Sequence, residues 1–169
     1  VDIDNKKCDI ASKWGINTVC SDHTSPIKNV LEMTDQLGAD GIVITASSKS
    51  KNLISDAAKM ARKRGKIVLV GVVGLDLDRS DFYEKELTFQ VSCSYGPGRY
   101  DMNYEEHGHD YPFPFVRWTE KRNFQAVLSA VESGSLDPSD LITGRYELNE
   151  FEKIYNDLNS KSSIAAIIN

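Results

Sequence analysis

Residues 66–73 read KIVLVGVV, and residues 41–46 read GIVITA. Both are continuous apolar runs rich in β-branched side chains, which is typical of strands that are covered on both faces. A helical pattern separates them over about residues 52–64, and Gly65 is expected to end it. A strand, a helix and a second strand in this order predict a βαβ unit and therefore a parallel sheet.

The same alternation extends in both directions from this unit. Before it, the patterns predict a strand end at 1–4, a helix at 5–14, a strand at 16–20 and a helix at 26–37 with Ser25 as its N-cap. After it, they predict a short helix at 80–86, a strand at 87–95, a loop at 96–115, helices at 118–132 and 149–158, and strands at 141–148 and 164–168. We therefore expect an α/β fold with a doubly wound, Rossmann-like, mostly parallel sheet.

Composition narrows the class of protein. The 169 residues are 40% hydrophobic and 27% charged, as in ordinary globular domains. The net charge of −5 gives no electrostatic reason to expect nucleic acid or an anionic membrane as a partner, and no apolar run has the roughly 20 residues that span a bilayer. The cysteines, Cys8, Cys20 and Cys93, form no CxxC pair, which favours reduced thiols in a cytoplasmic protein over a structural zinc site.

Asp2 is the first candidate for chemistry. An acidic residue at the end of the second strand of a dinucleotide-binding fold accepts hydrogen bonds from the adenosine ribose, and its charge disfavours the extra phosphate of NADP. A surface aspartate in a turn is the alternative interpretation. Asp4 competes for the same role, but we expect it to be the turn or cap residue.

The glycine-rich phosphate loop, GxGxxG, belongs about 20 residues before such an acid, whereas the sequence begins at Val1. We therefore expect a fragment that lacks the first βα unit. Because the first strand is central in the order 3-2-1-4-5-6, its loss leaves a gap beside the strand at 41–46. We expect either a non-native arrangement of residues 1–24 or another chain in that gap.

Two further groups of residues lie at predicted strand ends, where open α/β sheets bind ligands. Gly71 lets a ligand approach the backbone of residues 70–72, although close packing against a helix would explain the glycine equally well. Thr45, Ala46 and Ser47 are small enough to leave room for a flat adenine, and solvated strand-end residues are the alternative.

The order of these features resembles the C-terminal half of the medium-chain dehydrogenases/reductases, the zinc-type alcohol, threonine and sorbitol dehydrogenases. The resemblance rests on VDID at 1–4 and the lysines after it, the strand ending near Ala46, GKIVLVG at 65–71 and ITGRYEL at 142–148. It implies that residues 1–169 are a partial NAD(P)-binding domain. Its extension, about 116–169, would pack on a GroES-like catalytic domain outside this chain.

The resemblance also implies cofactor-binding roles for residues at the strand ends. Asp2 and Lys7 match the residues that contact the ribose, and Thr45 and Ala46 match those on the adenine side. The backbone that holds the nicotinamide carboxamide and the next strand end near the nicotinamide are matched by Val70, Gly71, Val72 and Ser94. NAD is then preferred over NADP. The resemblance places no catalytic residue or zinc ligand in this chain; a zinc ion would belong to the missing domain.

The implied activity is NAD(P)-dependent hydride transfer between an alcohol or carbonyl compound and the nicotinamide, with this chain inactive alone. The segments SYGPGRYD, YEEHGHDYP and VRWTEKRN, between residues 94 and 123, resemble a bacterial subgroup joined to a second sugar-type oxidoreductase domain in polysaccharide synthesis. This points to alcohol, polyol or sugar-like substrates. A Rossmann-like methyltransferase and a non-catalytic interaction domain that uses residues 96–117 remain alternatives.

The Tyr- and His-rich segment after the strand at 87–95 has two interpretations. It offers metal donors at Glu105, Glu106, His107, His109 and Asp110. Because no third histidine is nearby, we favour packing on the missing domain through the aromatic side chains Tyr100, Tyr104, Tyr111, Phe113 and Phe115. The strand at 87–95 is a candidate for pairing between subunits, so we expect a homo-oligomer.

Overall fold

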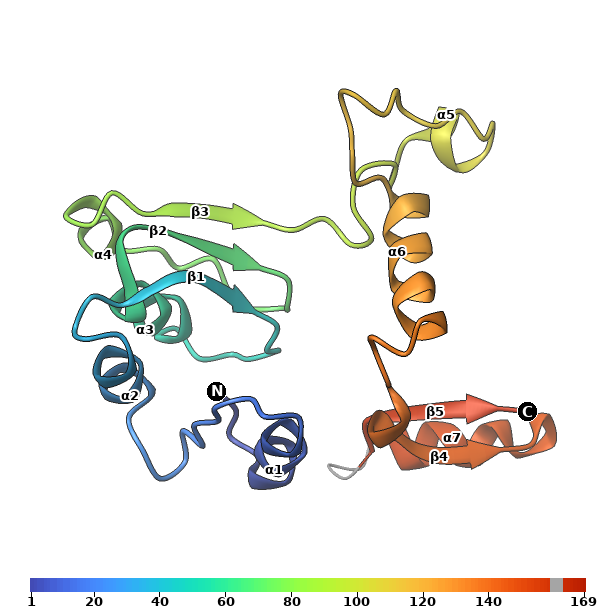
Figure 1. The fold of residues 1–169 in the computed structure, drawn as a ribbon, viewed down its shortest axis with the longest axis horizontal. Coiled ribbons are helices and arrows are strands. Elements are labelled where there is room, and N and C mark those ends of the chain that lie inside the picture. Colours follow the sequence, from blue (N-terminus) through green and yellow to red (C-terminus); the bar gives the residue numbers. More distant parts are fainter. Residues whose placement is uncertain (159–162) are drawn as a thin grey trace. The chain divides into compact units, whose positions relative to one another are not determined.

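Three parallel strands, β1 (Ala39–Ile44), β2 (Ala61–Leu69) and β3 (Thr88–Val91), form the larger sheet in the order β1-β2-β3 (Figure 1). The computed structural model describes residues 1–158 and 163–169. The chain divides into two units, Val1–His109 and Asp110–Asn169, and this sheet belongs to the first. The predicted α/β class with parallel strands is confirmed.

The core of the first unit lies between the sheet and its crossover helices. Helix α3 (Leu53–Met60) connects β1 to β2, and α4 (Arg79–Tyr83) connects β2 to β3. Side chains that alternate along the strands, such as Ile67 with 0% exposure, pack against the apolar side of α3. The buried cluster comprises Ile44, Ile54, Ala57, Ala58, Ala61, Ile67 and Leu69.

The opposite side chains of β1 are not covered. Val43 alternates with the core residues and is 64% exposed, so the prediction that residues 41–46 are covered on both faces is wrong for this chain. The strand also ends at Ile44, which leaves Thr45 and Ala46 beyond it. Within residues 1–158 and 163–169, no strand pairs with the second edge of β1.

The N-terminal segment forms less sheet than predicted. Among the described residues, the segments at 1–4 and 16–20 pair as strands only at an isolated parallel bridge between Asp2 and Cys20, outside the β1-β2-β3 sheet. Helix α1 (Asn5–Lys13) lies between them, and α2 (Pro26–Met33) follows with Ser25 as its N-cap. The expected non-native arrangement of residues 1–24 stays a prediction.

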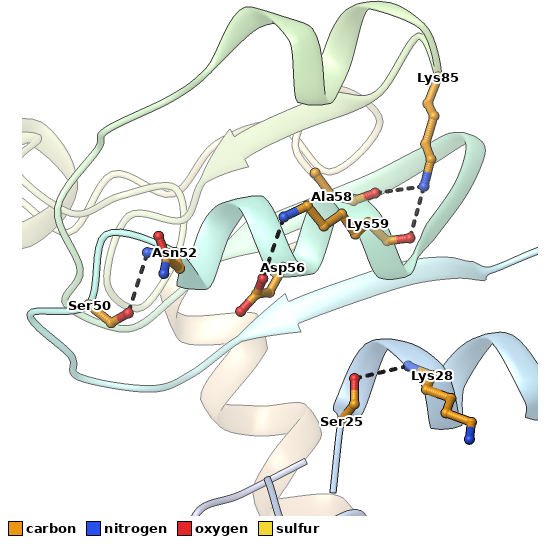
Figure 2. A network of polar contacts seen from close by, with 8 residues as sticks. All are labelled: Ser25, Lys28, Ser50, Asn52, Asp56, Ala58, Lys59 and Lys85. Atoms are coloured by element: carbon orange, nitrogen blue, oxygen red, sulfur yellow. Dashed lines mark hydrogen bonds and ion pairs between the residues drawn. The ribbon is translucent and has the colours of Figure 1, made fainter.

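Helix α3 ends at Met60 rather than at residue 64, because a side chain from a distant part of the sequence caps it. The Lys85 ammonium donates to the carbonyl oxygens of Ala58, Lys59 and Ala61 at 3.0, 2.9 and 2.8 Å. Figure 2 shows the first two of these bonds. A cation at these carbonyls also opposes the negative end of the helix dipole.

Hydrogen bonds from nearby side chains explain why other helix ends differ from the predicted ones. Helix α2 ends at Met33 rather than at residue 37: the Thr34 hydroxyl donates to the Val30 carbonyl at 2.7 Å and accepts from the Gly38 N–H at 3.0 Å. The predicted loop at 96–115 contains a short helix, α5 (Met102–Glu105), which Asp101 caps at the N-terminus.

The second unit contains a further parallel pair of strands. Helix α6 (Glu120–Glu132) precedes β4 (Ile142–Tyr146), and α7 (Phe151–Leu158) connects β4 to β5 (Ala165–Ile168). Two 3-10 helices precede β4 and α7, at Ser139–Leu141 and Leu148–Glu150. The predicted Asn cap of α7 is wrong, because a capping box of Glu147 and Glu150 opens this region.

Candidate functional site

The carboxyl ends of β1 and β2 continue beyond the sheet as two neighbouring segments, residues 45–48 and 70–73. The Ser48 N–H donates to the Val72 carbonyl at 3.0 Å, and Ser48 forms an isolated parallel bridge with Val73. Parallel strands bring their carboxyl ends to one rim, and the open sheets of this class bind ligands there. The two segments therefore form the first part of a candidate site.

Gly71 is required by the approach of these two segments to each other. The Val70 and Gly71 N–H groups both donate to the Ile44 carbonyl at 2.9 Å. A Cβ atom on Gly71 would lie 2.1 Å from the Ala46 carbonyl oxygen and 2.7 Å from the Thr45 carbonyl carbon. The close contact is thus with the neighbouring segment, a reason different from both sequence interpretations of this glycine, the ligand and the helix.

An open hollow of about 990 Å³ lies at the same rim. Its walls are two runs of residues, 47–51 and 72–76. Lys51 and Asp76 form an exposed ion pair at 3.6 Å, one residue from each wall. The Val72 side chain, 77% exposed, gives the wall an apolar surface. The serine hydroxyls and lysine ammonium groups could bind ribose hydroxyls and phosphates of a ligand. The apolar surface could contact an uncharged part of the same ligand.

The first wall is held in shape by hydrogen bonds between neighbouring residues. The Ser50 N–H donates to the Ser48 hydroxyl at 3.0 Å. The Asn52 N–H donates to the Ser50 hydroxyl at 3.3 Å, as Figure 2 shows. The sequence reasoning did not assign this wall. The run SSKSK at 47–51, directly after a buried strand, is the signal that could have found it.

Most of the predicted contact residues meet at this rim. Thr45 and Ala46 lie on one segment, and Val70, Gly71 and Val72 lie on the other. Ser94 follows β3, where the Ser92 N–H donates to the Leu69 carbonyl at 2.8 Å and so holds the start of its segment beside the end of β2. Ser94 itself is exposed and has a positive φ of 39°.

Asp2 and Lys7 belong to the N-terminal segment, outside the β1-β2-β3 sheet. Asp2 belongs to the bridge with Cys20, and its Oδ1 accepts from the Asp4 N–H at 2.9 Å. Lys7 is exposed on α1. Asp4 is the N-cap of α1 and accepts from the Lys6 N–H at 2.9 Å, so its expected role as a cap residue is confirmed. The ribose-binding role of Asp2 and Lys7 stays a prediction.

The Tyr- and His-rich segment contains short-range contacts of its own. Arg99 pairs with Glu105, and the His107 Nδ1 lies 3.3 Å from the Asn103 Oδ1. Among the described residues, no group of three or more His, Cys, Asp or Glu side chains could hold a metal ion. Tyr100 is 76% exposed; an interaction role for residues 96–117 stays a hypothesis.

No helix in the described ranges is long and apolar enough to cross a membrane.

Comparisons with known proteins agree with this geometry. The sequence model of the family "zinc-binding dehydrogenase" matches residues 1–106. The chain belongs to this family. The match covers the β1-β2-β3 sheet and the rim described above. The resemblance to the medium-chain zinc-type dehydrogenases is thereby confirmed, whereas a search of curated proteins gives no match.

Solved structures of several dehydrogenases have a similar fold. An alcohol dehydrogenase from Thermus sp. ATN1 is 18% identical with a TM-score of 0.73, and the alignment covers 96% of this chain and 41% of that one. The 2R,3R-butanediol dehydrogenase of Bacillus subtilis is 18% identical (TM-score 0.71; 98% and 41% covered). An Escherichia coli oxidoreductase/dehydrogenase of unknown specificity is 20% identical (TM-score 0.72; 97% and 41% covered). The chain therefore spans about two fifths of these structures.

Proposed function

We propose that this chain is the dinucleotide-binding part of an NAD(P)-dependent oxidoreductase that transfers hydride between an alcohol or carbonyl compound and the nicotinamide. The observation that carries the proposal is the pairing of segments 45–48 and 70–73 at the carboxyl ends of β1 and β2, beside an open hollow. Membership of the zinc-binding dehydrogenase family supports this chemistry over that of a methyltransferase.

The proposed roles follow from the chemistry of each wall. The main-chain N–H and C=O groups around Gly71 and Val72 would hold the nicotinamide carboxamide, and the small side chains of Thr45 and Ala46 would leave room for the adenine. The nicotinamide supplies the hydride chemistry when bound, while these residues orient it. A catalytic zinc ion, with the residues that bind the alcohol, polyol or sugar-like substrate, would belong to a part of the protein outside this chain.

A titration of the chain with NAD, followed by NMR, tests whether the rim binds the cofactor. We expect the amide signals of Thr45, Ala46, Gly71 and Val72 to shift in a saturable way, with weak affinity. S-adenosylmethionine is the parallel titration, because a methyltransferase would bind it at the same rim. Saturable shifts with S-adenosylmethionine and none with NAD would reject the proposal.

The preference for NAD over NADP is proposed to come from the Asp2 carboxylate, which would repel the extra phosphate. In the same titrations, Asp2→Ser should weaken NAD binding and reduce the ratio of the NADP to the NAD dissociation constants. Asp4→Ser is the matched control, because serine is also a good N-cap for α1. Equal effects of the two substitutions, or none of Asp2→Ser, would remove Asp2 from the site.

We also propose that the protein forms a homo-oligomer through the second edge of β3. In the described part of the chain that edge pairs with no strand, and the strand carries the exposed side chains of Thr88 and Gln90. An unpaired edge can add a strand from a second copy. The Ser92 N–H donates to Leu69 of β2, so the alternation along the strand turns the Val91 N–H toward the free edge. Sedimentation velocity should show association that Val91→Pro weakens, and a monomer at all concentrations would contradict the proposal.

A further inference from the structure

Two cysteine side chains approach the same short piece of backbone, outside the rim. The Cys8 Sγ lies 4.0 Å from the Asp2 carbonyl oxygen, and the Cys20 Sγ lies 3.6 Å from the Ile3 carbonyl oxygen. Sequence reasoning treated them only as two reduced thiols. The structure places both against residues 2–3, although one comes from α1 and the other from the segment after it.

The backbone around the two thiols is held by several hydrogen bonds. The Cys8 N–H donates to the Asp4 carbonyl at 3.1 Å. Cys20 is the bridge partner of Asp2, and the flanking N–H of Ser21 donates to the Asp2 carbonyl at 2.9 Å. Both thiols therefore lie against carbonyl groups of adjacent residues, Asp2 and Ile3, which places them in the same part of the first unit.

The two thiols differ in access to solvent. Cys8 is 8% exposed, whereas Cys20 is half-buried. Burial raises the pKa of the Cys8 thiol above its usual range, and the nearby Cys20 and Asp2 raise it further. An oxidant therefore reaches Cys20 first, and Cys8 is protected until a reactive sulfur appears next to it.

We propose that Cys8 and Cys20 form a redox pair that closes to a disulfide when the protein meets a peroxide. The Cys20 thiolate attacks one peroxide oxygen, the O–O bond breaks, and a sulfenic acid and hydroxide form. The Cys8 thiolate then attacks the Cys20 sulfur, and hydroxide leaves as the S–S bond forms. Each thiol loses one proton, the two sulfurs together lose two electrons, and the peroxide is reduced to two water molecules.

Closure would fix the segment that carries Asp2 to both α1 and residues 19–21. The disulfide would close a short loop, and such cross-links stabilise mainly by restricting the open state of the chain. Amide hydrogen exchange at Asp2 and Ser21 should therefore slow by roughly a hundredfold on oxidation. This proposal does not depend on cofactor binding, so the failure of either one leaves the other intact.

The test is oxidation of the 169-residue chain with hydrogen peroxide, followed by N-ethylmaleimide and non-reducing peptide mapping. We expect one cross-linked product that joins the Cys8 and Cys20 peptides and is lighter by two hydrogen atoms than the separate thiols. Cys93→Ser is the matched control because Cys93 is exposed, and this variant should give the same product.

Variants that lack one cysteine of the pair show the order of the steps. In Cys20→Ser, Cys8 should stay a thiol that N-ethylmaleimide labels after unfolding. In Cys8→Ala, Cys20 should accumulate as the sulfenic acid. Two outcomes would overturn the proposal: oxidation of Cys93 alone, or separate sulfinic acids on Cys8 and Cys20 with no cross-link.

Discussion

Gly71 allows residues 45–46 and 70–72 to approach each other at the rim, because it has no side chain. We predict that Gly71→Ala lowers the free energy of unfolding by about 1–3 kcal/mol, the usual cost of forcing extra atoms into a packed region. The new Cβ would lie 2.1 Å from the Ala46 carbonyl oxygen, which belongs to backbone and cannot rotate away.

Gly74→Ala is the matched control for this prediction. A Cβ atom on Gly74 meets nothing within 4 Å, so the change should stay within about 0.5 kcal/mol. Urea denaturation followed by circular dichroism measures both variants. Equal midpoints for the two alanine variants would show that the segments can separate without loss of stability.

Lys85 makes the second prediction at the scale of a residue. Lys85→Met keeps the aliphatic stem and removes hydrogen bonds to two α3 carbonyls and to the carbonyl of Ala61, which follows the helix. We therefore expect the free energy of unfolding to fall by about 1–3 kcal/mol. Burial lowers the pKa of Lys85 and Asp81 opposes this, so part of the gain is offset by desolvation. Lys63→Met, at an exposed position, is the control in the same urea measurement.

At the scale of elements, the sequence predicted which helices and strands exist better than where they end. Apolar periodicity placed α3 and β2 in the right order because burial determines that pattern. The end of α3 could not be predicted from its own residues, since Lys85 lies far along the chain and supplies the cap. The predicted strand at 16–20 is wrong for a similar reason: a strand needs a partner, and among residues 1–158 and 163–169 only Asp2 pairs with it.

The β4–α7 pair allows a prediction about pH. The Tyr146 hydroxyl on β4 donates to the Asp157 Oδ2 on α7 at 2.8 Å, and this bond raises the pKa of Tyr146 above its ordinary value of 10.0. A pKa that is higher in the folded than in the unfolded state stabilises the fold fully below pH 10, and the effect is lost as pH rises through the folded-state pKa.

We therefore expect wild type to be more stable than Tyr146→Phe at neutral pH, with the difference shrinking above pH 10. Urea midpoints at a series of pH values measure this, and absorbance titration should lose one tyrosine whose pKa lies above the ordinary value. Tyr83→Phe, at an exposed position on α4, is the control for the removal of a tyrosine hydroxyl at the surface. A difference that grows with pH would contradict the assignment.

At the scale of the whole molecule, the candidate site was predictable only in part. Thr45, Ala46 and residues 70–72 could be placed together because parallel strands share one carboxyl rim. The hollow between residues 47–51 and 72–76 could not, since it depends on the pairing of Ser48 with Val73 rather than on either segment alone. The packing of residues 116–169 on a catalytic domain stays a prediction; the chain spans about two fifths of the dehydrogenase structures that it resembles.

The division into two units leads to the last prediction. Every residue of the main buried cluster lies between Ile44 and Leu69, within the first unit, so the stability of the sheet should not depend on residues 110–169. A chain truncated after His109 should keep slow amide exchange at Ile67 and Leu69, because burial and strand pairing on both sides of β2 protect them. Hydrogen exchange followed by mass spectrometry compares the truncated and full chains, and an Ile67→Ala variant of each shows that the signal reports this core. Fast exchange in the truncated chain alone would mean that the second unit is needed to complete the sheet's stability.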